Sequence, residues 1–183
     1  MRKHILLVFI CFLLPLLCSA QESMITISAS ARASGMSGHG IVLFIENIET
    51  HEIYKSKSLN GMSNNAVIEN VSAGLYEVCR VEIPFGDKWF MNDSPELKSF
   101  FGTLEIRPNT NYFMGKYLST FQGKISNRQV LFSLEGHVMP EKLIKFINKK
   151  GLDADGFVPI KPKEESFVLA EFSDAGLRIS IEL

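Results

Sequence analysis

Three histidines, His39, His51 and His137, lie beyond residue 20 and are the first side chains to consider for acid–base or metal chemistry. Familiar zinc sites place their ligands in H-x-H or H-E-x-x-H spacings or use a C-x-x-C pair, and none of these spacings occurs. We therefore expect ordinary surface histidines. The alternative is an enzyme whose site residues cannot be recognised from one sequence. Folding would then gather these histidines with carboxylates in a pocket.

Other motifs of catalysis or metal binding are also incomplete. The segment Gly35–Gly40 is rich in glycine but lacks the lysine and the following helix of a phosphate cradle. Asp153–Gly156 begins like a calcium loop, but Val158 stands where an EF-hand requires glycine. The neighbours Glu164 and Glu165 say nothing about the spatial separation on which glycosidase chemistry depends. The sequence therefore predicts no catalytic residue, no metal ligand, no cofactor and no enzyme activity.

The only tryptophan, Trp89, is followed by Phe90 and Met91 in a segment, 87–98, that we expect to be irregular. Aromatic and methionine side chains among polar groups could form a platform for a sugar ring or for a partner's apolar side chain. The sequence favours the alternative, in which Trp89 or Phe90 closes one end of the fold. These three residues are the only ligand-binding candidates that the sequence offers.

The first 20 residues have the three parts of a cleavable export signal. Arg2 and Lys3 are basic, residues 5–17 are apolar apart from Pro15, and Cys18-Ser19-Ala20 supplies small residues before a cleavage site. The apolar run is shorter than the roughly 20 residues of a membrane-spanning helix. We expect a periplasmic or extracellular protein. A lipid anchor at Cys18 is disfavoured because Leu17, which precedes it, is not small.

Removal of residues 1–20 takes away two basic residues and no acidic one, so the formal net charge changes from −1 to −3. This chain has no basic surplus that would favour nucleic acid or an anionic membrane surface. Cys79 is then the only cysteine, which excludes an intrachain disulfide. We expect Cys79 to be a small buried apolar residue rather than a reactive thiol.

The remaining pattern is mainly β. Short apolar or alternating runs separated by turn residues predict an antiparallel β-sandwich over residues 21–139. The small-residue stretch 31–40 has the composition of a loop. The predicted strands are 24–30, 41–45, 53–56, 66–71, 75–85, 101–107, 111–120 and 129–134.

Residues 140–183 are predicted to form a short helix and a closing hairpin packed on the same domain. Pro140 suits a first helical turn, Gly151 suits a left-handed cap, and Leu143, Ile144 and Ile147 make one apolar face. The hairpin strands are expected at 167–172 and 177–182. Neither element can bury its apolar side chains alone.

Three segments carry a family-like pattern: Gly40–Phe44, Tyr54–Ser56 and Asn70–Val78, the last of which contains G-x-Y-x-V starting at Gly74. With these segments the chain resembles the carboxypeptidase-regulatory-like, transthyretin-like group of exported β-sandwich modules. It implies a sandwich in which Tyr76 packs between the sheets, a non-catalytic role and no catalytic residues. The segment Phe101–Gly115 is similar to a strand–turn–strand segment of small exported Bacteroidetes proteins of uncharacterised function.

We thus expect an exported, non-catalytic β-sandwich that binds another protein or a cell-envelope component. It is expected to bind no nucleic acid and not to span a membrane. A carbohydrate-binding accessory module that uses the Trp89 segment is the first alternative, and an enzyme with an unrecognised site is the second.

Overall fold

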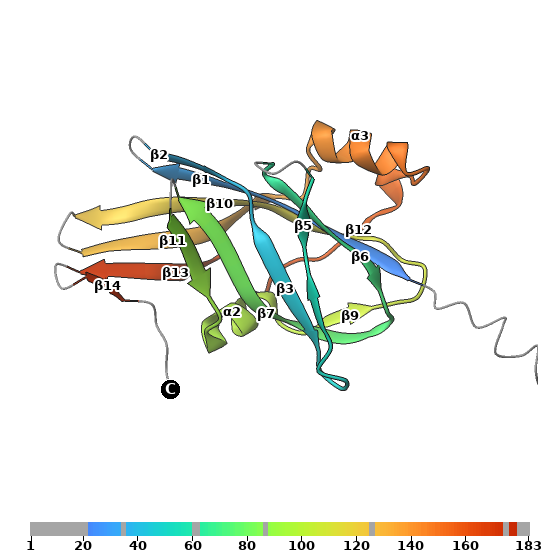
Figure 1. Cartoon of the computed structure of the whole chain (residues 1–183), viewed down its shortest axis with the longest axis horizontal. Helices are drawn as coiled ribbons and strands as arrows, with labels where there is room; N and C mark the ends of the chain where they lie inside the picture. The colour runs from blue at the N-terminus through green and yellow to red at the C-terminus, as the bar shows by residue number, and fades with distance from the viewer. Residues whose placement is uncertain are drawn as a thin grey trace, which may run out of the picture.

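The computed structural model describes residues 22–33, 36–59, 63–85, 88–124, 127–173 and 176–178, and the predicted export signal lies outside this set. The described chain is mainly β, with two sheets and two α-helices, and this arrangement confirms the predicted fold class (Figure 1). No described helix is long and apolar enough to cross a membrane.

The larger sheet, sheet A, has the strand order β14-β13-β11-β10-β1-β6-β5, with β2 beside β1 and β12 beside β10. The β1–β10 and β10–β12 pairs are parallel, and the other pairs are antiparallel. The strands are β1 (Ser23–Ala33), β2 (Met36–His39), β5 (Lys57–Ser58), β6 (Asn65–Val71), β10 (Tyr112–Lys124), β11 (Asn127–Gly136), β12 (Val158–Pro159), β13 (Ser166–Ser173) and β14 (Gly176–Arg178).

The smaller sheet, sheet B, packs across sheet A and has the order β4-β3-β7-β8, with β9 beside the start of β7. Its strands are β3 (Val42–Asn47), β4 (Ile53–Lys55), β7 (Gly74–Phe85), β8 (Lys88–Asn92) and β9 (Leu104–Ile106). Alternate residues of β3 are buried, as expected for a strand with one face on the core. The main core fills the space between the two sheets.

Tyr76 lies in this core and is completely buried, which confirms its predicted position. Its hydroxyl donates to the Ser72 carbonyl at 2.9 Å, and its ring meets that of Tyr54 edge to face at 5.9 Å. A tyrosine that bonds back to the backbone a few residues upstream is a recurrent device of β-sandwiches. It fixes the turn that leads into β7.

Residues 87–98 were expected to be irregular, but nearly all of the described part, 88–98, belongs to a strand and a helix, so that prediction is wrong. Its first part is β8, and its second part begins helix α2 (Pro95–Phe101). Pro95 occupies the first helical turn, where its missing N–H costs nothing, and Gly102 ends the helix with φ +66°. Phe100 of α2 is buried against the rings of Tyr117 and Phe132.

Two further predictions need correction. Only Leu104–Ile106 of the strand expected at 101–107 is extended, because Phe101 ends α2. Residues 31–33 and 36–39, expected in a loop, continue β1 and form β2, because backbone pairing between these strands outweighs the small-residue composition.

The predicted C-terminal helix is α3 (Glu141–Lys149), which is followed by a short 3₁₀ turn (Ala154–Gly156). Leu143 and Ile147 are fully buried and belong to a second apolar cluster on the outer face of sheet A. Sheet A thus has sheet B on one face and α3 over part of the other (Figure 1). The cluster comprises Met24, Val67, Phe113, Leu143, Ile147 and Phe157, with Leu152 packed against it.

Candidate functional site

The predicted Trp89, Phe90 and Met91 lie in β8, where the backbone pairs them with Pro84, Ile83 and Glu82 of β7. Met91 is 40% exposed, and its sulfur lies 3.8 Å from Arg80 Nη1. The side chains of Trp89 and Phe90 lie outside the described part of the structure. Two interpretations therefore stay predictions: that these residues form a platform for a ligand, and that Trp89 or Phe90 closes one end of the fold.

The structure does not bring the two described histidine side chains together. His51 is in the β3–β4 turn of sheet B, where its Nδ1 lies 2.8 Å from Glu46 Oε1. His137 follows β11 of sheet A, and its Nε2 lies 3.0 Å from the Ile160 carbonyl oxygen. The side chain of His39 is outside the described set. The described residues contain no group of three or more His, Cys, Asp or Glu placed to hold a metal ion.

Cys79 is half-buried on β7, and its Sγ donates to the Phe44 carbonyl at 3.5 Å. Burial, followed by the nearby carboxylate of Glu46, raises the pKa of this thiol. Because the thiolate is the reactive form, both effects lower the reactivity of Cys79 at neutral pH.

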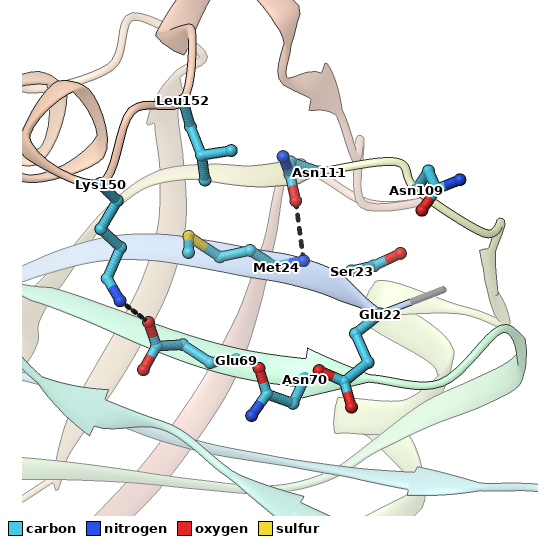
Figure 2. A pocket seen from close by; sticks show the side chains of 9 residues that line it. All are labelled: Glu22, Ser23, Met24, Glu69, Asn70, Asn109, Asn111, Lys150 and Leu152. Atoms are coloured by element: carbon cyan, nitrogen blue, oxygen red, sulfur yellow. Dashed lines mark hydrogen bonds and ion pairs between the residues drawn. The ribbon is translucent and has the colours of Figure 1, made fainter. Parts of the chain in front are cut away.

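A cleft of about 520 Å³ opens beside the beginning of β1, within the roughly 300–1,000 Å³ of small-molecule sites (Figure 2). The segments around it are the start of β1, the end of β6, the β9–β10 turn and the chain after α3. Its lining is Glu22, Ser23, Met24, Glu69, Asn70, Asn109, Asn111, Lys150 and Leu152.

A β-bulge in β6 forms one wall of the cleft. Ser23 of β1 pairs with Val71 and Ile25 pairs with Ile68, so Glu69 and Asn70 together oppose the single residue between them in β1. Asn70 has φ +60°, a left-handed conformation that asparagine tolerates better than most residues. Bulges reorient side chains and occur often at functional sites. Here the bulge residues both line the cleft.

The Asn111 carboxamide has a fixed orientation. The Met24 N–H donates to the side-chain Oδ1 of Asn111 at 2.9 Å, and the backbone carbonyl of Asn111 accepts from the Val158 N–H at 2.8 Å, which holds the main chain at this residue. Because only the amide oxygen can accept a hydrogen bond, Nδ2 is the atom that points away from Met24. Nδ2 donates no hydrogen bond within the described part of the chain. Asn111 therefore lines the cleft with a carboxamide that is held through its oxygen and whose N–H donors have no partner among the described residues.

The β9–β10 turn, which carries Asn109, is held at its base. The Ser23 hydroxyl donates to the Arg107 carbonyl at 2.8 Å, and the Arg107 N–H donates to the Tyr112 hydroxyl at 2.9 Å. Asn109 is exposed with φ +53°. These bonds tie the turn to β1 and β10, so this wall is pre-formed.

Charge in the cleft is nearly balanced. Lys150 Nζ forms an ion pair with Glu69 and lies 5.3 Å from the centre of the Phe146 ring. Glu22 is exposed and adds a second carboxylate, so the lining carries a formal net charge of −1. Met24, which is only 7% exposed, and Leu152 supply an apolar part. The cleft can thus hydrogen-bond a polar ligand, and its charge disfavours anions.

No sequence motif marks the cleft residues, since they come from four segments separated along the chain. The only local signals are two asparagines in turn-like contexts, Asn70 before Val71-Ser72 and Asn109 after Pro108.

Comparison with protein-family models, curated proteins and solved structures finds no match to this chain.

Proposed function

We propose that this protein is an exported, non-catalytic binding protein of the cell envelope, built on a sandwich like that of the carboxypeptidase-regulatory-like modules. Its ligand site is the cleft at β1, β6 and the β9–β10 turn, and its ligand is an uncharged polar unit, namely a sugar of an envelope glycan. The oriented carboxamide of Asn111 is the observation that carries this proposal.

A neutral sugar suits the chemistry of the lining. Each hydroxyl both donates and accepts, and the carboxamides of Asn70, Asn109 and Asn111 offer both kinds of atom. The two carboxylates add acceptors, and the net negative charge argues against uronic acids or phosphate. The pre-formed walls reduce the entropy that binding would cost.

The ionisable groups of the cleft support a non-catalytic role. Glu69 and Lys150 are paired with each other, and within the described part of the chain Glu22 is the one ionisable side chain of the lining that has no ion pair. General acid–base chemistry on a glycosidic bond needs a pair of carboxyl groups with separate roles.

The test is a titration of the protein with neutral and anionic oligosaccharides, measured by calorimetry or ligand-observed NMR. We expect saturable binding of a neutral oligosaccharide, weaker binding of a uronic acid oligomer, and no hydrolysis of either. Asn111→Asp keeps the acceptor for the Met24 N–H but removes the donor, so it should weaken neutral-sugar binding. Asn148→Asp adds the same charge at an exposed position of α3 outside the lining and should change nothing. Equal loss in both variants, or no saturable binding by the parent protein, would contradict the proposal.

A further inference from the structure

We infer that the cleft recognises the N-acetyl group of an amino sugar; this inference rests on the proposed function and names its ligand class. An acetamido group presents a carbonyl acceptor beside a small apolar methyl group. Its binding site therefore needs an oriented N–H donor with apolar side chains next to it. Asn111, Met24 and Leu152 provide this combination.

Geometry places these three side chains together. Met24 donates its backbone N–H to Asn111 Oδ1, so the carboxamide lies directly beside the start of β1. Met24 and Leu152 belong to the same apolar cluster. In Figure 2, Asn111 Oδ1 faces the Met24 nitrogen, while the amide nitrogen lies on the opposite side of the carboxamide group. An acetyl carbonyl could accept from this nitrogen while its methyl group contacts Met24 and Leu152.

The rest of the lining is consistent with a sugar rather than an isolated acetyl group. Asn70, Asn109 and Glu22 are exposed polar residues in the same cleft and can bond the ring hydroxyls. The net charge of −1 would by itself favour a free amino sugar, which is cationic. A preference for the acetylated form therefore cannot come from net charge and must come from the acetamide contacts.

The experiment compares trimers of N-acetylglucosamine, glucose and glucosamine as ligands of the full protein. One neutral hydrogen bond and one buried methyl group are together worth roughly a factor of ten in affinity. We expect the acetylated trimer to bind about tenfold more tightly than the glucose trimer. Asn111→Asp and Leu152→Ala should each reduce this ratio. Asn148→Asp is the control, and melting curves verify that each variant is folded.

The outcomes separate this inference from the proposed function. Equal binding of the acetylated and glucose trimers, or tighter binding of the glucosamine trimer, would overturn the inference and leave a sugar-binding cleft. An acetyl preference that persists unchanged in both Asn111→Asp and Leu152→Ala would overturn the assignment to these residues. Failure of all three trimers to bind would overturn the proposed function together with the inference.

Discussion

Replacement of Tyr76 tests the packing between the sheets. The ring is fully buried, it contacts Tyr54 edge to face, and its hydroxyl bonds the Ser72 carbonyl. Truncation of a buried aromatic residue to alanine costs about 3–5 kcal/mol. Removal of the hydroxyl alone, in Tyr76→Phe, loses one neutral hydrogen bond, or about 0.5–1.5 kcal/mol. We expect these two losses for Tyr76→Ala and Tyr76→Phe, respectively.

The assay is urea unfolding followed by circular dichroism, with the free energy of unfolding taken from the midpoint at constant slope. Tyr76→Ala should also lower the melting temperature by roughly 6–20 °C, given about 2–4 °C per kcal/mol for a chain of this length. Tyr54→Ala is the control, because Tyr54 is only half-buried but loses the same ring contact. If Tyr76→Ala were no more destabilising than Tyr54→Ala, the assignment of Tyr76 to the core would be wrong.

Three other predictions concern the pH dependence, the C-terminal unit and export. Burial raises the pKa of Tyr117, so the folded state favours the neutral phenol. The free energy of unfolding should therefore keep its full value below about pH 10, the ordinary pKa of tyrosine, and decline above it. Thermal melting at alkaline pH should show a less steep decline for Tyr117→Phe. Deletion of residues 140–183 removes Leu143 and Ile147 from the second apolar cluster and should give an aggregating, dye-binding protein by fluorescence; a monomeric, cooperatively folding 21–139 chain would contradict this. Mass spectrometry of exported protein should show loss of residues 1–20, whereas a lipid-modified Cys18 would overturn the predicted cleavage.

Elements with a long, regular pattern were predictable from sequence. The strand expected at 75–85 is β7, Gly74–Phe85, and the helix expected at 140–150 is α3, Glu141–Lys149. In both cases, the hydrophobic period extends over enough residues to distinguish one buried face. Helix α2 was missed because seven residues make barely two turns, and its only signals are Ser94-Pro95 at the start and Gly102 at the end.

The cleft could not be predicted because long-range pairing creates it. The parallel neighbours β1 and β10 are almost ninety residues apart, and this pairing is what places Asn111 beside Met24. The bulge at Glu69 and Asn70 depends on the register between β6 and β1, which hydropathy does not specify. Lys150 reaches Glu69 only because α3 packs on the outer face of sheet A.

The most direct test of the proposed function is an NMR titration of ¹⁵N-labelled protein with the N-acetylglucosamine trimer. We expect saturable shifts at the backbone amide of Met24, the bulge amides of Glu69 and Asn70, and the side-chain amide of Asn111. Saturable shifts centred instead on Trp89 and its neighbours in β8 would contradict the assignment of the cleft and favour the Trp89 platform. The absence of any saturable shift would contradict recognition of the N-acetyl group, and the same absence with the glucose trimer would contradict glycan binding itself.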